Sequence, residues 1–145
     1  MPRLRIQAEV LTIKTKYPFK IARGSRDTYR TVLVRVIDHD GLEGWGEATP
    51  QMFYGETVET ALAALEAYAP VMPEDAFQLE DAERAMEKQL IGNNSVRAAL
   101  STALHDLVGK RLGVPIWKLW GLDAAKAPMS TFTIGIDTEI GRAHV

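Results

Sequence analysis

The chain has 145 residues, of which 46% are hydrophobic and 25% are charged, and its formal net charge at pH 7 is −2. This is the composition of a globular protein that can bury a core without metals or disulfides. The absence of cysteine excludes disulfides, thiolate metal sites and a cysteine nucleophile. The slight negative charge argues against a nucleic-acid partner or an anionic membrane surface.

The N-terminal residues lead directly into a strand pattern, without the apolar segment of a signal peptide. No apolar run approaches 18 residues, so a membrane span is not expected. We therefore expect a soluble, cytoplasmic protein with no membrane partner.

The first part of the chain predicts an antiparallel meander of three strands. Alternation of Ile6, Ala8, Val10 and Thr12 with polar residues predicts a strand over about residues 3–13 that buries one face. Proline lacks the donor that a central strand needs, so Pro18 is expected to end this strand. Residues 19–29 are then expected to form a basic, flexible loop.

The other two strands flank a hairpin turn. The β-branched run at residues 31–37 predicts the strongest strand, and Asp40-Gly41 predicts the turn that follows it. Residues 42–48 predict the returning strand, and its glycines indicate a bulge or a close approach of another backbone.

After Thr57 the hydrophobic period changes from two to 3.6 residues, which predicts helices. Thr57 is expected to cap the first helix, and Asn94 or Ser95 the long one. Gly113 is expected at the C-terminal end of the long helix. The expected helices span residues 57–69, 78–90, 95–112 and 116–119, a linker follows at 125–128, and residues 130–136 predict another strand.

Three arginines near a Gly-Ser pair are the most informative polar residues. Arg23, Arg26 and Arg30 surround Gly24-Ser25, and guanidinium groups bind carboxylates in a bidentate manner. The segment is therefore either an anion receptor or an ordinary solvated basic loop. Two such loops at the same edge of the meander could close over a small anionic ligand.

Other sequence patterns are weaker indications of a functional site. The glycines at residues 41–46 lack the spacing of a phosphate-binding loop and favour a twisted hairpin with a packed tryptophan. His105 and Asp106 are neighbours on a helix and diverge, so an Asp106–Lys110 pair is expected instead of a catalytic dyad. No spacing of histidines or carboxylates suggests a metal site.

Several segments together resemble the N-terminal capping domain of the enolase superfamily. Within it, the chain is most similar to the muconate-lactonizing-enzyme subgroup and to L-Ala-D/L-Glu-type dipeptide epimerases. The resemblance covers residues 1 to about 138 and is carried by residues 18–26, 32–36, 44–50, 54–56, 94–107, 113–121 and 131–136.

The resemblance implies an α+β fold, in which the meander and a helical bundle form a cap on a (β/α) barrel. It also implies an isomerase with a Mg²⁺ ion held by three carboxylates and two lysines that move an α-proton through an enediolate. In the family these groups lie on later barrel strands, so no catalytic residue and no metal ligand is expected in this chain. The implied substrate-binding residues are Arg23, Arg26, Tyr54 and Thr133, with Arg23 or Arg26 meeting an acidic side chain of a dipeptide such as L-Ala-L-Glu.

The expected organisation has three parts. Residues 1–124 form the cap, residues 125–138 form a linker and the first strand of an incomplete barrel, and residues 139–145 are interpreted as a non-native tail. Codons for those last seven residues can spell the beginning of a common sequencing adapter. The chain alone is expected to be inactive, and the full-length protein is expected to form a homo-oligomer.

Two alternatives stay open. The chain could be part of another enzyme of the same subgroup, namely an o-succinylbenzoate synthase, an N-succinylamino-acid racemase or a cycloisomerase. It could also be a stand-alone α+β module that binds a small carboxylate.

Overall fold

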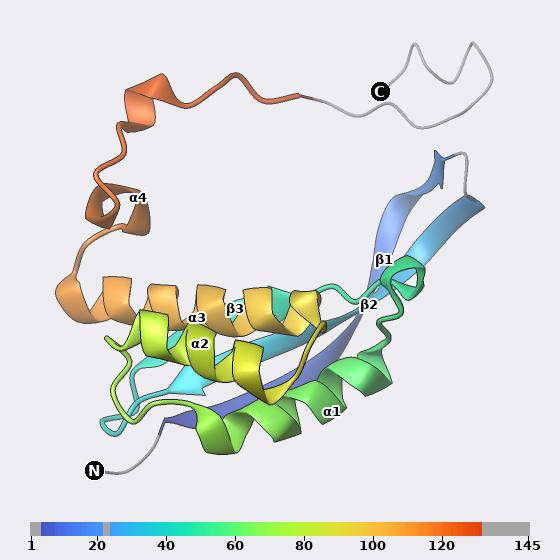
Figure 1. Cartoon of the computed structure of the whole chain (residues 1–145). Helices are drawn as coiled ribbons and strands as arrows, with labels where there is room; N and C mark the ends of the chain where they lie inside the picture. The colour runs from blue at the N-terminus through green and yellow to red at the C-terminus, as the bar shows by residue number, and fades with distance from the viewer. Residues whose placement is uncertain (1–3, 22–23, 132–145) are drawn as a thin grey trace.

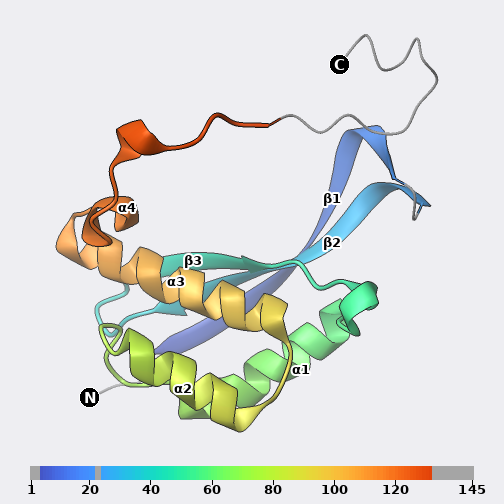
Figure 2. The same cartoon turned by 45° about the horizontal axis from the view of Figure 1, so that its top comes forward.

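The computed structural model describes residues 4–21 and 24–131. A sheet in the order β1-β2-β3 is covered on one face by helices, as Figure 1 and Figure 2 show. This confirms the α+β class and the antiparallel meander. The strands are β1 (Arg5–Ile21), β2 (Gly24–Ile37) and β3 (Glu43–Ala48). The helices are η1 (Met52–Tyr54), α1 (Val58–Tyr68), η2 (Ala69–Val71), α2 (Leu79–Gln89), α3 (Asn94–Leu112), α4 (Ile116–Leu119) and η3 (Ala124–Lys126).

The core lies between β2 and the helices. Val32, Val34 and Val36 alternate along β2 and are almost fully buried, as the β-branched run predicts. The buried apolar side chains of α1, α2 and α3 pack against them. In β1 the expected buried face is only partly formed. Ile6 packs on the core, whereas Val10 is 36% exposed because β1 is an edge strand that the helices barely reach.

The first strand is longer than expected, and the prediction that Pro18 ends it is wrong. Pairing with β2 runs from Arg5 to Lys14, is interrupted, and resumes from Phe19 to Ile21. Residues 15–18 lie opposite the single unpaired residue Asp27, so Pro18 falls in an irregular stretch that does not need its missing donor.

Residues 19–29 are therefore not a loop within the described part of the chain. β3 pairs with β2 only from Val32 to Ile37, so beyond Val32 the strands β1 and β2 pair only with each other. Residues 11–21 and 24–31 thus form a two-stranded ribbon that projects past the end of α1 (Figure 1). An isolated two-stranded ribbon is marginally stable, so this segment is free to adapt to what it contacts.

Two glycines set the distance between β3 and α3. A Cβ atom added to Gly44 would overlap the carbonyl oxygen of Ala103, and one added to Gly46 would overlap that of Ala99. Both glycines are buried, which confirms the expected close backbone approach. Side chains of α3 also cover the outer edge of β3: Asp106 accepts from the N–H of Trp45 at 2.8 Å, and Lys110 donates to the carbonyl of Glu43 at 2.9 Å.

The helix ends follow the sequence signals with one exception. Thr57 forms a capping box with Thr60, and Gly113 adopts the left-handed conformation at the end of α3. The expectation that Asn94 or Ser95 caps α3 is wrong, because Asn93 is the N-cap residue and its side chain makes no capping hydrogen bond.

The expected strand at residues 130–136 lies mostly outside the described residues. Ser130 and Thr131 are described and are not in a strand. Among the described residues, no helix has both the length and the apolar character needed to cross a membrane.

Candidate functional site

The structure brings the ribbon and the segment after β3 together around a pocket of about 190 Å³. One wall comes from the ribbon and the other from the turn around η1. Small-molecule sites usually enclose roughly 300–1,000 Å³, so this pocket has room for only part of a ligand. The lining residues are Phe19, Gly24, Arg26, Tyr29, Gln51, Met52 and Phe53.

The turn wall is a compact segment, residues 49–56, which we call the aromatic turn. Its backbone closes on itself, since the N–H groups of Tyr54 and Glu56 both donate to the carbonyl of Gln51, at 2.9 and 3.2 Å. Gly55 takes a left-handed conformation with φ of 74°, which a side chain would disfavour. The turn holds Met52, Phe53 and Tyr54 at the surface, each at least 67% exposed.

Arg26 is the charged group of the pocket. Among the described residues no carboxylate lies within ion-pair distance of it, whereas Arg30 pairs with Glu59 of α1 at 3.0 Å. Of the three arginines in the basic segment, Arg30 is thus engaged by the fold and Arg26 stays open to a ligand anion. A guanidinium beside aromatic side chains suits a molecule with a carboxylate and an apolar portion.

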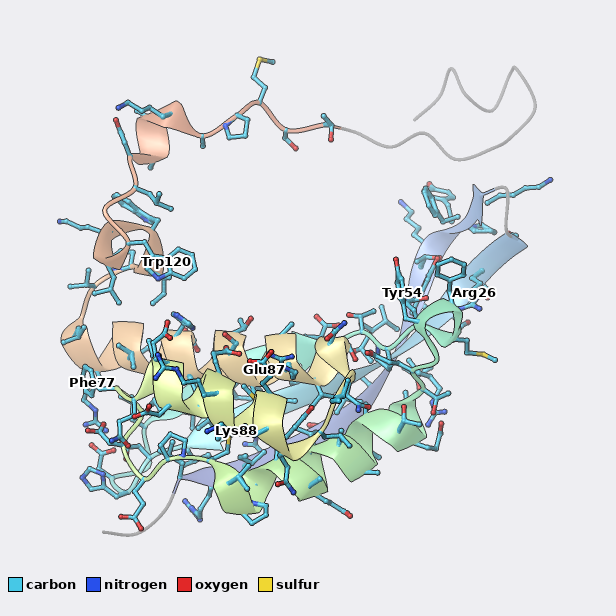
Figure 3. All side chains as sticks on the ribbon, viewed as in Figure 1. Arg26, Tyr54, Phe77, Glu87, Lys88 and Trp120 are labelled. Atoms are coloured by element: carbon cyan, nitrogen blue, oxygen red, sulfur yellow. The ribbon has the colours of Figure 1, made fainter. Side chains whose placement is uncertain are left out.

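Of the remaining predicted binding residues, Tyr54 is described by the structure, and Arg23 and Thr133 are not. Tyr54 does not line the pocket itself; its ring meets that of Phe53 edge to face at 5.1 Å, and Figure 3 shows it on the turn near Arg26. Tyr54 lines a neighbouring depression with Gln51 and Glu56. Arg23 and Thr133 lie outside the described residues.

A second hollow of about 470 Å³ lies between β3, α3 and α4 and holds serine, histidine and aspartate side chains. They do not form a nucleophile and its base. The Nδ1 atom of His105 lies 2.8 Å from the backbone carbonyl of Ser101, and Asp106 is engaged by Lys110 at 2.6 Å. This confirms the expected Asp106–Lys110 pair. The ring of His105 meets that of Trp120 edge to face.

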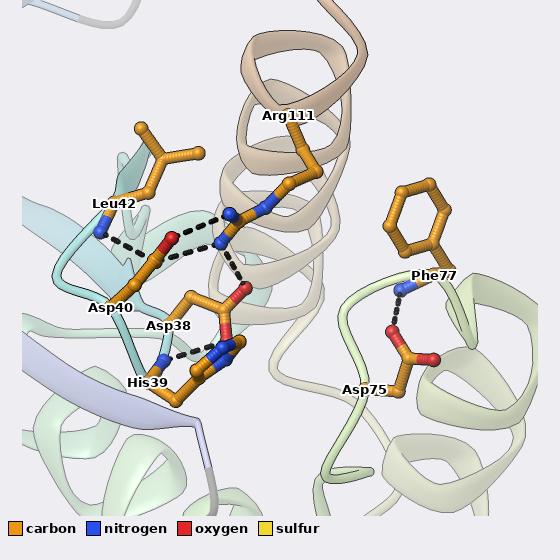
Figure 4. Close-up of polar contacts among 7 residues, drawn as sticks. All are labelled: Asp38, His39, Asp40, Leu42, Asp75, Phe77 and Arg111. Atoms are coloured by element: carbon orange, nitrogen blue, oxygen red, sulfur yellow. Dashed lines mark hydrogen bonds and ion pairs between the residues drawn. The ribbon is translucent and has the colours of Figure 1, made fainter.

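One carboxylate cluster was missed by the sequence analysis. The potential ligand atoms of Asp38, His39 and Asp40 lie within 4.8 Å of one another. However, Arg111 of α3 already binds both carboxylates, through contacts of 2.5 to 2.7 Å (Figure 4). The cluster therefore serves to hold the β2–β3 turn on the end of α3, and this occupied donor set does not fit a resident metal ion.

Hydrogen bonding favours the ionised form of the two aspartates of the cluster. Bonds from Arg111 and from the N–H of Leu42 hold the pKa of Asp40 well below its usual range. Burial of Asp38 opposes ionisation, but hydrogen bonds from His39 and Arg111 outweigh it and lower the pKa of that carboxyl. The same contacts raise the pKa of Arg111, first through Asp40 and then through Asp38.

Comparison with known proteins identifies the family to which the chain is similar. Residues 5–121 match the family described as mandelate racemase / muconate lactonizing enzyme, N-terminal domain. The chain is 42% identical over 126 residues to an L-Ala-D/L-Glu epimerase of Bacteroides thetaiotaomicron, covering 87% of this chain and 33% of that protein. It is 34% identical over 136 residues to a hydrophobic dipeptide epimerase of Citrifermentans bemidjiense, covering 92% of this chain and 37% of that protein.

The solved structures that are similar to this chain also include dipeptide epimerases. The dipeptide epimerase of Cytophaga hutchinsonii, complexed with Mg and the dipeptide D-Ala-L-Val, is 26% identical and superposes with a TM-score of 0.85. That match covers 98% of this chain and 39% of the other. The chain therefore spans about a third of the length of the relatives it matches.

Proposed function

The chain belongs to the N-terminal-domain family of mandelate racemase and muconate lactonizing enzyme, and we propose that it is the substrate-selecting part of a Mg²⁺-dependent dipeptide epimerase. The observation that carries this proposal is the pocket between the ribbon and the aromatic turn, with Arg26 in its wall and no carboxylate of the described residues paired with it. The relatives named as dipeptide epimerases support the reaction class.

In the proposed reaction, the α-carbon of a dipeptide such as L-Ala-L-Glu is inverted by removal and return of its proton through an enediolate. The proton-transferring groups and the metal ligands lie on residues outside this chain. When bound, Mg²⁺ would supply positive charge that stabilises the negative charge developing on the substrate. Residues of this chain select the substrate, since a small pocket with one cation can hold the acidic side chain.

We propose binding roles for three of the described residues. Arg26 binds the side-chain carboxylate of the dipeptide, and the exposed rings of Phe53 and Tyr54 exclude water once the substrate is in place. Arg23 and Thr133 remain proposed contacts to the same substrate. The proposed organisation is a cap at residues 1–124, a linker and first barrel strand at residues 125–138, and a non-native tail at residues 139–145, with the whole protein a homo-oligomer.

The test follows the α-hydrogen of the substrate. The whole protein, in D₂O with Mg²⁺, should incorporate deuterium at the α-carbon of the C-terminal residue of L-Ala-L-Glu, as read by mass spectrometry. Removal of Mg²⁺ with a chelator should stop the exchange. The 145-residue chain alone should show no exchange, and exchange by that chain would overturn its assignment as a part without catalytic groups.

The whole protein should also be tested with a set of other substrates, to separate epimerisation from related reactions. The set should include hydrophobic dipeptides, N-succinylamino acids and cis,cis-muconate. Muconate is included because a muconate cycloisomerase of Acinetobacter baylyi is 32% identical over 122 residues. Turnover of muconate without any dipeptide exchange would replace the proposed function with cycloisomerisation.

A further inference from the structure

Glu56 is the buried acidic side chain of the described residues, with a relative exposure of 9%. It is the last residue of the aromatic turn. A carboxylate is costly to bury unless its oxygens are hydrogen-bonded, so its partners indicate what it holds.

Those partners belong to the start of α3. Oε1 of Glu56 accepts from the N–H of Asn94 at 2.6 Å, and Oε2 accepts from the N–H of Ser95 at 3.3 Å. The first N–H groups of a helix lack partners within the helix and carry a partial positive charge. Because the side chain of Asn93 makes no capping bond, Glu56, which lies 38 positions before Asn94, supplies the cap.

The helix that Glu56 holds is packed closely on the sheet. α3 has 19 residues, and its inner face is buried against β3 at the positions of Gly44 and Gly46. The backbone hydrogen bonds of Tyr54, Gly55 and Glu56 are made within the aromatic turn, and the large side chains of the turn are exposed. Its end at residue 56 is therefore where a rigid helix can fix its position.

We propose that Glu56 is a positioning residue for substrate binding, which anchors the aromatic turn to the N-terminus of α3 and so fixes the pocket wall opposite Arg26. This inference rests on the proposed function for its substrate. Glu56 does not line the pocket beside Arg26; it acts through the turn that carries Gln51, Met52 and Phe53.

The experiment uses the whole protein and compares four forms: wild type, Glu56→Ala, Glu56→Gln and Met86→Ala. Glu56→Ala removes both acceptors, while Glu56→Gln keeps one oxygen in place. Met86 of α2 is fully buried, so Met86→Ala weakens the core away from the turn and serves as the control for general loss of stability.

The first measurement is amide hydrogen exchange, which needs no substrate. Glu56→Ala should speed exchange at residues 51–56 and at residues 94–95, and Glu56→Gln should speed it less. Met86→Ala should not speed exchange selectively at these residues. Equal exchange in wild type and Glu56→Ala would overturn the anchoring, whether or not the protein is an epimerase.

The second measurement is KM against kcat for L-Ala-L-Glu. Loss of two charge-assisted bonds should raise KM about tenfold in Glu56→Ala with little change in kcat, because only binding contacts are loosened. Glu56→Gln should restore KM in part, and Met86→Ala should leave it unchanged. An unchanged KM in Glu56→Ala, or an equal rise in Met86→Ala, would overturn the positioning role. Absence of epimerisation in the wild type would overturn the proposed function, and with it the role of Glu56 in substrate binding. The amide hydrogen exchange would then test only whether Glu56 anchors the aromatic turn.

Discussion

At the scale of single residues, the close contact between β3 and α3 depends on two glycines, which have no side chain. Gly44 and Gly46 leave room for the helix backbone, and carbonyl oxygens of α3 lie where their Cβ atoms would be. Backbone cannot move aside as a flexible side chain can, so any larger residue must push the helix from the sheet.

Gly46→Ala should therefore lower the free energy of unfolding by about 1–3 kcal/mol or more, as forced overpacking does in other cores. Chemical denaturation of the two forms measures the difference. Glu47→Ala is the matched control, because Glu47 is the next residue of the same strand and is exposed. Equal stability of the glycine and alanine forms would show that β3 and α3 are not packed this closely.

A second residue-scale prediction concerns pH and the Arg111 contacts. The pKa values of Asp38 and Asp40 are both lowered from their ordinary value of 3.8. A lowered pKa contributes stability above the ordinary value, and this contribution is lost as the pH falls through the lowered value. The stability advantage of wild type over Arg111→Met should be complete at pH 7 and should shrink as the pH falls below about 4.

Denaturation curves at a series of pH values measure that advantage. Arg84→Met is the control, since the pair that Arg84 makes with Glu80 on the same helix is exposed. A difference between wild type and Arg111→Met that stays constant down to the lowest pH would contradict the role assigned to the two aspartates.

At the scale of elements, the helix that follows the aromatic turn has its own start signal, a capping box at its N-terminus. The Thr57 side chain accepts from the N–H of Thr60 at 3.2 Å, and the Thr60 hydroxyl accepts from the N–H of Thr57 at 2.8 Å. The reciprocal bonds fix where α1 begins, and hence where the aromatic turn must end.

Thr57→Ala should cost about 1 kcal/mol of stability, the usual value for a lost N-cap. Thr57→Ser retains the hydroxyl and should stay close to wild type in the same thermal or chemical denaturation. If serine and alanine destabilise equally, the methyl group of Thr57 and not its hydroxyl carries the effect.

The elements also show what local sequence can and cannot predict. The run at residues 31–37 and the cap at Thr57 were predictable, because neighbouring residues determine both. The continuation of β1 through Pro18 was not, since it depends on an irregular pairing with β2. Nor were the contacts of Glu56 with Asn94 or of Arg111 with Asp38, whose partners lie 38 and 73 positions apart. Such contacts arise only once helix and sheet have packed.

At the scale of the whole molecule, the segment that follows α3 carries large apolar side chains at its surface. Trp117, Trp120 and Leu122 are 45 to 59% exposed, and Met129 is 94% exposed. Exposed apolar groups gathered in one region usually mark an interaction surface. In the proposed full-length enzyme, the remainder of the protein covers this segment.

The 145-residue chain by itself should therefore self-associate, with a mean sedimentation coefficient that rises with concentration. Replacing Leu122 and Met129 by serine should reduce this association, whereas serine at the exposed Ile91, in the connection between α2 and α3, should not. A monomer at every concentration in sedimentation velocity would contradict the expectation.

The central claim is that the ribbon and the aromatic turn select the substrate through Arg26. The most direct test is the ratio of kcat/KM for L-Ala-L-Glu to kcat/KM for L-Ala-L-Leu, measured in the whole protein for wild type, Arg26→Met and Arg84→Met. The account predicts that Arg26→Met lowers this ratio about tenfold or more, as the loss of a charge-assisted bond would, and that Arg84→Met leaves it unchanged. A ratio that is the same in wild type and Arg26→Met would contradict the claim.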